Sequence, residues 1–379
     1  MKIGIIGRTN VGKSTLFKAM TLEDVKIEDR PFTTIDPNHG VGYATVQCPE
    51  KEFGMKCVPH NSPCIDGIRF VPLEVIDVAG LISGASEGKG LGNKFLSDAM
   101  EADALIEVID ISGTTDSSGF HASDYDPGND IEMVTEELTQ WIATVIRRAN
   151  FRNGADIVES VYKNLSGLKF SPETIKEAVK TLDIHTIDEN TSTELSSYIL
   201  KKDKPMIIAC NKMDITPDLD TKLKDLKKRF DYTFIPCSAA AELTLKEAHK
   251  HGFISYSSER FRVLKDLTPE QKNGLNIIEN IIKTHGSTGV QNVVNTLLFD
   301  LMGSKVIFTV EDEKKLTDGR GRALPDAYIV DKEATPKDVA GLVHSEVAAK
   351  YKGAIDCRSG LKIKNDDPVK TGQILKILT

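Results

Sequence analysis

A glycine-rich segment near the start of the chain has the residue types needed to bind phosphate. It consists of Gly7, Arg8, Thr9, Asn10, Val11, Gly12, Lys13, Ser14 and Thr15. This order fits G-x-x-x-x-G-K-[ST], in which glycines let the backbone N–H groups point at phosphate oxygens. Lys13 would contact the β- and γ-phosphates, and the Ser14 hydroxyl would be a ligand of Mg²⁺. The spacing therefore predicts a nucleoside triphosphate site.

Two patterns downstream would complete a site for Mg²⁺ and the γ-phosphate. Asp77 and Gly80 form a D-x-x-G pattern, in which Asp77 would hold Mg²⁺ through a water and the Gly80 N–H would bond the γ-phosphate. A polar segment broken by prolines lies between this pattern and the first loop, and it contains Phe32, Thr33 and Thr34. A threonine there can bind Mg²⁺ and order its loop when the γ-phosphate is present. We favour Thr34 as the ligand, with Thr33 as the alternative.

A third group of residues has the pattern that reads a guanine base. Asn211, Lys212 and Asp214 form N-K-x-D directly after an apolar run. The Asp214 carboxylate can accept hydrogen bonds from the ring N–H and the amino group of guanine, whereas adenine would leave it unpaired. Lys212 would lie along the base, and Asn211 would tie this segment to the phosphate-binding loop. Farther on, a backbone N–H in Ser238-Ala239-Ala240, with Ala239 favoured, would meet the guanine O6.

Four residues outside these patterns have side chains that could bind a metal. Cys57, His60 and Cys64 lie in an insertion at residues 48–66, and Cys48 could supply a fourth ligand. Thiolates and imidazoles are the usual ligands of structural Zn²⁺. The spacing does not match a common zinc finger, so incidental loop thiols are the competing interpretation.

Short apolar runs and amphipathic stretches predict the elements that position these residues. Runs near residues 2–6, 70–77, 104–111 and 205–210 are apolar enough for the parallel strands of an α/β sheet covered on both faces. Residues 130–202 read as a helical insertion, opened by Asn129 as a cap. Thr268 would cap a helix to residue 285, and Thr288 another to residue 301. After residue 304 the pattern of strands and one helix predicts a β-grasp domain.

Composition limits the class of protein. The chain has 379 residues with 40% hydrophobic and 27% charged residues, which is enough for two or three domains. Its net charge of −8 argues against general nucleic-acid binding. We expect no membrane segment and no signal peptide, because no apolar run is long enough and the phosphate-binding loop follows the start at once. Six cysteines without an export signal predict reduced thiols in a cytoplasmic protein.

The motifs together resemble the Obg family of GTPases. The resemblance is carried by residues 7–15, 31–40 and 77–96, and the insertion before Asn211 and the C-terminal tail are similar to the YchF branch in an archaeal-type version. It implies a P-loop GTPase domain at residues 1–129 and 203–303, a helical insertion at 130–202 and a TGS domain, which is a ubiquitin-like β-grasp fold, at 304–379. It also implies GTP and GDP as ligands, Mg²⁺ as cofactor, and association with ribosomes or RNA.

Two residues bear on how such a protein would hydrolyse GTP. Leu81 follows D-x-x-G, where many GTPases have a glutamine that orients the attacking water. We therefore expect slow hydrolysis by the isolated protein. Asn10 resembles the asparagine of GTPases that bind K⁺ beside the phosphates, so K⁺ could stabilise the charge that develops there. Asn10, Lys13, Thr34 and Gly80 are the predicted catalytic residues.

Two alternatives remain open at the level of sequence. Some YchF relatives depart from N-K-x-D and prefer ATP, so an ATPase that uses the same loop is the first alternative. The second is a module in which bound GTP fixes the domain geometry and hydrolysis is incidental.

Overall fold

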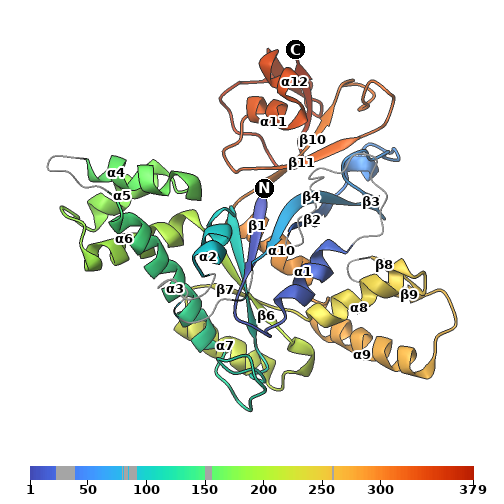
Figure 1. Ribbon diagram of the computed structural model, residues 1–379. Coiled ribbons are helices and arrows are strands. Elements are labelled where there is room, and N and C mark those ends of the chain that lie inside the picture. The colour runs from blue at the N-terminus through green and yellow to red at the C-terminus, as the bar shows by residue number, and fades with distance from the viewer. Residues whose placement is uncertain (23–38, 79, 81–83, 85–91, 150–155, 258–259) are drawn as a thin grey trace.

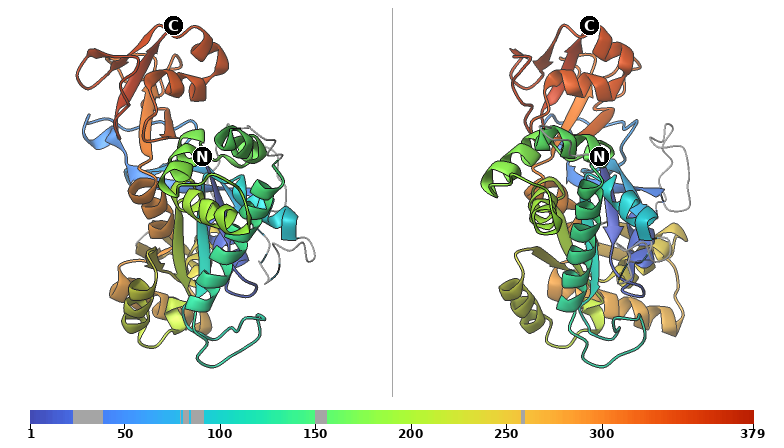
Figure 2. Two further views of the ribbon diagram at one scale, coloured as in Figure 1. Left: turned by 90° about the vertical axis from the view of Figure 1, so that its left-hand side faces the viewer. Right: turned by 60° about the vertical axis from the view of Figure 1, so that its left-hand side comes forward.

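The architecture is that of a central sheet with three bodies attached to it (Figure 1). The computed structural model describes residues 1–22, 39–78, 80, 84, 92–149, 156–257 and 260–379. The three attached bodies are a helical arm, a pair of helices with a small two-stranded sheet, and a C-terminal domain (Figures 1 and 2).

The central sheet has seven strands. Five run parallel in the order β4-β1-β5-β6-β7, β2 is added antiparallel at the β4 edge, and the short β3 also pairs with β4. The strands are β1 (Lys2–Ile6), β2 (His39–Gln47), β3 (Cys64–Ile65), β4 (Ile68–Asp77), β5 (Ala104–Asp110), β6 (Met206–Asn211) and β7 (Thr233–Pro236). Every residue of β5 and β6 is buried, as expected for parallel strands covered on both faces.

Helices cover both faces of this sheet. α1 (Lys13–Thr21) and α10 (Val290–Asn295), which continues into a π-helical turn, η4 (Thr296–Leu301), pack on one face. α2 (Gly92–Met100), α3 (Gly128–Arg147) and α7 (Leu219–Arg229) lie on the other. α8 (Ala239–Lys250) and α9 (Pro269–His285) flank the hairpin of β8 (Ile254–Ser257) and β9 (Arg260–Val263). The predicted α/β fold with helices on both faces is confirmed.

The helical insertion forms an arm beside the sheet. Its first helix, α3, packs along α6 (Glu189–Asp203), and α4 (Ile157–Leu165) and α5 (Pro172–Thr181) complete the arm. Ser171 caps α5 through its hydroxyl, with Pro172 in the first turn. The predicted cap of α3 is wrong, because Pro127 rather than Asn129 is the residue before its first turn, and its side chain makes no cap bond.

The C-terminal domain is the predicted β-grasp fold. Its five strands have the order β11-β10-β14-β12-β13, with β10 and β14 parallel. They are β10 (Lys305–Val310), β11 (Asp326–Val330), β12 (Gly353–Asp356), β13 (Leu361–Ile363) and β14 (Ile374–Leu378). The connecting segment holds two short helices, α11 (Pro336–Val343) and α12 (Ser345–Ala349), where the sequence predicted one.

The carboxyl ends and the amino ends of the parallel strands have different neighbours. The phosphate-binding loop, Asp77 and Asn211 all lie at the carboxyl ends of parallel strands, which meet at one edge. The C-terminal domain packs at the amino ends of these strands, near the first residue of the chain (Figure 1). One buried apolar cluster runs from the central sheet through Cys48 and Cys57 into the C-terminal domain, where it includes Phe308.

Candidate functional site

Two glycines give the loop after β1 its shape. Gly7 has φ +135°, and a Cβ there would lie 2.5 Å from the Val108 carbonyl oxygen on β5. Gly12 has φ +102°, and a Cβ there would collide with the side-chain nitrogen of Asn211. Both positions combine a backbone conformation that side chains rarely adopt with a close neighbour. The loop is thus held against β5 and β6, and it leads directly into the N-terminus of α1.

Lys13 opens α1 and lies inside the loop. Its Nζ donates a hydrogen bond to the Arg8 carbonyl oxygen, and the residue is only 7% exposed. Burial lowers the pKa of Lys13 to about 8, while the Asp77 carboxylate opposes this shift. At neutral pH the ammonium therefore still carries its charge, close to the carboxylate that could hold a metal.

The two predicted Mg²⁺ ligands of the described chain lie next to each other. The Ser14 hydroxyl donates to Oδ2 of Asp77 across 3.1 Å. Burial raises the pKa of Asp77, against the lowering effects of Ser14 and Lys13. Gly80 is close to the same point, since a Cβ there would lie 3.2 Å from Lys13 Nζ. Oxygen donors of this kind suit Mg²⁺.

Asn211 connects the N-K-x-D segment to the phosphate-binding loop, as its pattern predicted. Its Nδ2 donates to the Val11 carbonyl oxygen at 2.9 Å, and its Oδ1 accepts from the Ala239 N–H at 3.0 Å. One buried side chain thus joins the ends of β1, β6 and β7. Because the Ala239 N–H is engaged here, the structure leaves the next amide in α8, Ala240 N–H, without an acceptor among the described residues.

Lys212 is fixed by the end of β5. Its Nζ lies 2.7 Å from Asp110 Oδ2 and 2.9 Å from Thr115 Oγ1. Burial acts to raise the pKa of Asp110, but the hydrogen bonds from Lys212 and Ser112 outweigh it and lower the pKa. The aliphatic part of Lys212 is therefore held in one place, which suits a surface for a flat base.

Asp214 has the opposite environment. It is exposed, in a 3-10 turn formed by Met213–Ile215, and within the described residues its carboxylate has no hydrogen-bond or ion-pair partner. Ser238 caps α8 by accepting from the Ala241 N–H at 3.2 Å. The carboxylate that was predicted to read a base is thus available to a ligand.

The phosphate-binding loop also contacts residues 112–130, which no motif in the sequence predicts. The Arg8 guanidinium forms a buried ion pair with Asp130 at 2.5 Å and lies over the Tyr125 ring, 4.7 Å from its centroid. Asn10 Nδ2 donates to the Gly119 carbonyl oxygen at 2.7 Å. Motif spacing cannot predict contacts between residues so far apart in the sequence. The only signal in the sequence is that the loop after β5 is rich in glycine.

Four predicted residues lie outside the described part of the chain. Phe32, Thr33 and Thr34 fall within residues 23–38, and Leu81 falls within residues 81–83. The predicted roles of Phe32, Thr33 and Thr34 in binding nucleotide and Mg²⁺ stay predictions, as does the slow hydrolysis expected from Leu81.

The cysteine insertion brings a different set of side chains together from the one that the sequence predicted. The ligand atoms of Cys48, Glu50, Cys57 and Cys64 all lie within 4.8 Å of one another. His60 does not belong to this group, because its Nδ1 lies 3.0 Å from Asp326 of the C-terminal domain. The predicted ligand set is corrected accordingly, with Glu50 in place of His60.

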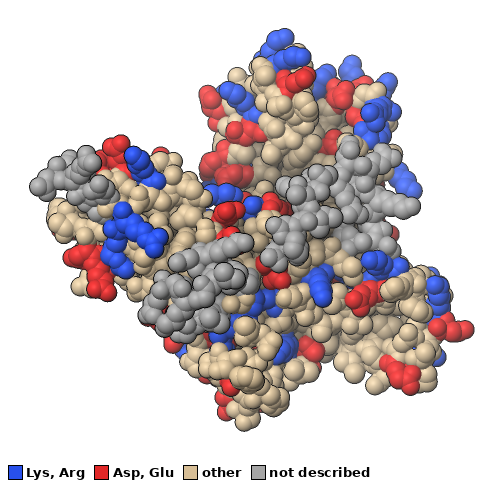
Figure 3. All heavy atoms as spheres, viewed as in Figure 1, with Lys and Arg blue, Asp and Glu red and all other residues tan. Residues whose placement is uncertain are grey.

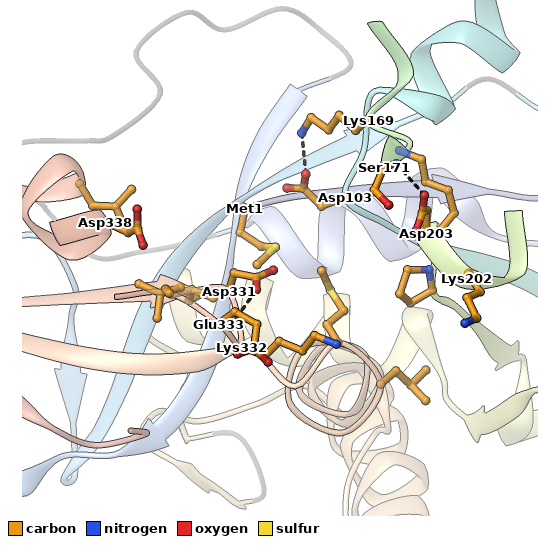
Figure 4. A pocket seen from close by; sticks show the side chains of 18 residues that line it. Met1, Asp103, Lys169, Ser171, Lys202, Asp203, Asp331, Lys332, Glu333 and Asp338 are labelled. Atoms are coloured by element: carbon orange, nitrogen blue, oxygen red, sulfur yellow. Dashed lines mark hydrogen bonds and ion pairs between the residues drawn. The ribbon is translucent and has the colours of Figure 1, made fainter. Parts of the chain in front are cut away.

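An open cavity of about 870 Å³ lies near Met1, between the amino ends of the parallel strands and the C-terminal domain. Figure 4 shows Asp103, Lys169 and Asp203 on one side and residues of the C-terminal domain on the other. Lys169 Nζ pairs with Asp103 at 2.6 Å, and the Ser171 N–H donates to Asp203 at 2.7 Å. The lining residues do not include the phosphate-binding loop, so the cavity is separate from it.

The fold and this arrangement of loops define a P-loop GTPase. Family models match in the same order along the chain: "50S ribosome-binding GTPase" at residues 2–149, "Obg-like GTPase YGR210-like, G4 motif-containing domain" at 209–312 and "TGS domain" at 316–379. An uncharacterized GTP-binding protein of Methanocaldococcus jannaschii is 42% identical, covering 100% of this chain and 98% of its own length. The crystal structure of a GTP-binding protein from Pyrococcus horikoshii has 31% identity and a TM-score of 0.78, covering 100% of both chains. The chain belongs to the Obg-like GTPase family, in its YchF branch.

Relatives in this family differ in the nucleotide that their names give. An uncharacterized GTP-binding protein of Schizosaccharomyces pombe is 33% identical over 90% of this chain and 89% of its own. The "ribosome-binding ATPase YchF" of Haemophilus ducreyi is 28% identical, covering 77% of this chain and 79% of its own.

No helix in the described ranges is both long and apolar enough to span a membrane.

Proposed function

We propose that the protein is a Mg²⁺-dependent GTPase that acts as a switch in the cytoplasm. The observation that carries the proposal is the position of Asn211, whose side chain joins the phosphate-binding loop to the base-reading segment through Val11 and Ala239. One residue thereby sets the distance between the phosphate and base subsites. The exposed Asp214 completes the specificity for guanine.

The metal would be held by Ser14 and Asp77. Their oxygens are 3.1 Å apart, and both are of the hard type that Mg²⁺ prefers. When bound, Mg²⁺ neutralises charge on the β- and γ-phosphates. Lys13 supplies a second positive charge from within the loop, and the Gly80 N–H is proposed as a donor to the γ-phosphate. Thr34 is proposed as a further ligand, with Thr33 as the alternative.

The base would be read by three groups. Asp214 accepts from the ring N–H and the amino group of guanine, and Lys212 lies against the base because Asp110 fixes its ammonium. We propose the Ala240 N–H as the donor to O6, since the Ala239 N–H already bonds Asn211. Adenine offers neither donor to Asp214 and would leave a carboxylate unpaired.

The rate of hydrolysis is proposed to be low in the isolated protein. Leu81 cannot hydrogen-bond a water, so the nucleophile must be positioned by the backbone, another side chain or a partner. A ribosome is the proposed partner, because a relative is named a ribosome-binding ATPase and a family model is named for 50S binding. On the face drawn in Figure 3, basic side chains are scattered among acidic ones, which favours a specific surface over general attraction to RNA.

ATP is the second candidate nucleotide, because relatives carry the name ATPase. The test is competition of GTP and ATP for the purified, Mg²⁺-loaded chain against a fluorescent GDP. We expect GTP to compete at much lower concentrations than ATP. Tighter binding of ATP would overturn the proposed substrate while leaving the phosphate site intact. Phosphate release with and without ribosomes then separates a switch from a module in which hydrolysis is incidental.

A further inference from the structure

The cluster of Cys48, Glu50, Cys57 and Cys64 lies outside the nucleotide site. The four ligand atoms are mutually within 4.8 Å, and Cys64 Sγ lies 3.9 Å from Glu50 Oε1. Around a zinc ion with Zn–S bonds of about 2.3 Å, tetrahedral ligand atoms lie about 3.8 Å apart. The side chains are thus arranged with roughly the separation that a four-coordinate metal requires.

A buried cation lies beside the cluster. Arg69, on β4 opposite Cys64, is fully buried, and among the described residues no carboxylate forms an ion pair with it. Its Nη1 donates to the Ser62 carbonyl oxygen at 2.9 Å, whereas its Nε has no partner there. A buried cation is stabilised by nearby negative charge. Three thiolates and a carboxylate around a divalent ion would provide a net charge of −2 close to this guanidinium.

The segment that carries the cluster has little regular structure of its own. Residues 48–67 contain a single 3-10 turn, Pro49–Lys51, and the two-residue strand β3. The Cys57 N–H donates to Glu50 Oε2 at 3.0 Å, so the carboxylate that faces the sulfurs is already oriented. A segment of this kind is the usual setting of a structural zinc, which replaces the missing core with metal–ligand bonds.

The same segment holds the C-terminal domain. The Val58 N–H donates to Ala323 at 2.9 Å and the His60 N–H to Pro325 at 2.8 Å. Asn61 exchanges two hydrogen bonds with Ala327, at 2.9 and 3.1 Å. These contacts form a continuous row between residues 58–61 and 323–327.

We propose that Cys48, Glu50, Cys57 and Cys64 bind one structural Zn²⁺, which fixes residues 48–67 and thereby holds the C-terminal domain to the nucleotide-binding domain. The ion takes no part in nucleotide chemistry. It sits at the far end of the β2–β4 ribbon, whose opposite end carries Asp77 of the nucleotide site.

The first experiment is metal analysis of the purified full chain. We expect about one zinc per chain, released when a mercurial reagent reacts with the thiols. The Cys57→Ser variant should lose the zinc, and Cys357→Ser, which removes a half-buried thiol outside the cluster, should retain it. Glu50→Gln keeps the three sulfurs and should bind zinc at least roughly tenfold more weakly in competition with a chelator.

A second measurement does not depend on any variant folding. Co²⁺ added to the chelator-treated wild-type chain should give a thiolate-to-cobalt charge-transfer band and the strong visible absorption of a tetrahedral site. A chain without zinc and without this band would overturn the proposal, as would a disulfide between two of the three cysteines. Nucleotide plays no part in these assays, so their outcome is independent of the GTPase proposal.

Hydrogen–deuterium exchange tests the docking role. Removal of zinc should increase exchange in residues 48–67 and 323–327, where amides such as those of Val58 and Ala327 bond across the interface. Exchange in β1 should stay unchanged, because it lies in the core of the central sheet. Zinc removal without faster exchange at 323–327 would refute the docking role.

Discussion

Arg8 of the phosphate-binding loop forms a buried ion pair with Asp130 in the first turn of α3, with 2.5 Å between Nη2 and Oδ1. Both side chains are nearly inaccessible, and Tyr125 covers the guanidinium. The Arg8 carbonyl oxygen accepts the hydrogen bond of Lys13, so the position of Arg8 bears directly on the ammonium that is proposed to bind phosphate. The helical arm that begins with α3 is therefore joined to the nucleotide site by this pair.

Removal of the charge at position 130 should destabilise the fold. Asp130→Asn leaves Arg8 buried without a counter-charge, for which we expect a loss of about 3–5 kcal/mol in the free energy of unfolding. Chemical denaturation monitored by circular dichroism measures this loss. The control is Asp225→Asn, which removes an exposed partner of Arg229 and should cost about 0.5 kcal/mol or less. Equal effects of the two substitutions would contradict the importance of the Arg8–Asp130 pair.

The lowered pKa of Lys13 predicts that nucleotide binding depends on pH. Burial lowers this pKa from 10.5 to about 8, and a bound phosphate would raise it again. Affinity for GTP should therefore fall as the pH rises through about 8, and binding just above that pH should take up protons. Calorimetry in buffers of different ionisation enthalpy detects this uptake as a heat that depends on the buffer. Identical heats in all buffers would show that Lys13 does not change its protonation.

The lowered pKa of Lys13 also makes the stability of the fold depend on pH. Between the folded pKa of about 8 and the unfolded value of 10.5, the unfolded chain binds more protons at Lys13 than the folded chain does. The free energy of unfolding contributed by Lys13 therefore rises with pH across this window. Below pH 8 the cost of burying the charged ammonium is fully present.

Gly80 should not tolerate a side chain. A Cβ there would lie 2.8 Å from Thr9 Cγ2 and 3.2 Å from Lys13 Nζ, so Gly80→Ala should displace the Gly80 N–H that is proposed to donate to the γ-phosphate. We expect a larger loss of affinity for a nonhydrolysable GTP analogue than for GDP, measured by fluorescence titration. Gly274→Ala in α9 is the control, because a Cβ there has no neighbour within 4 Å, and it should raise stability by about 0.5–1 kcal/mol without affecting nucleotide. Parallel losses for both nucleotides would contradict a γ-phosphate role.

Asn10 predicts a dependence on K⁺. Its Nδ2 donates to Gly119, so its Oδ1 is the atom that would face a monovalent ion. We expect faster GTP hydrolysis in K⁺ than in Na⁺ at equal ionic strength, and Asn10→Ala should remove the difference. Equal rates of the unaltered chain in both salts would exclude this role for Asn10.

The parts of the molecule that could be predicted from sequence are those set by local pattern. The phosphate-binding loop brings its residues together within one turn, and Thr268 caps α9 through a capping box that spans four residues. The predicted cap at Thr288 is wrong, because its hydroxyl bonds the buried Glu242 and Gly289 precedes α10 instead. Tertiary contacts of this kind overrule a local signal.

Contacts between distant segments explain the remaining differences. The His60 imidazole bonds the Asp326 carboxylate, which lies 266 residues away in the chain. No sequence pattern near His60 predicts this contact. Glu50 joins the three cysteines only in the fold, and no spacing pattern in the sequence singles it out. The pairing of Arg8 with Asp130 likewise depends on how α3 packs against the sheet, which the separate patterns of the two segments do not specify.

Substitution of Asp214 by asparagine tests the central claim most directly. The amide can donate a hydrogen bond where the carboxylate accepted one, so it fits xanthine, which has a carbonyl oxygen in place of the amino group of guanine. Competition binding to the Asp214→Asn chain should show roughly 100-fold weaker GTP and tighter xanthosine triphosphate, since bonds to a charged group contribute about 1.5–3 kcal/mol each. An unchanged preference for GTP over both xanthosine triphosphate and ATP would contradict the assignment of Asp214 as the residue that reads the base.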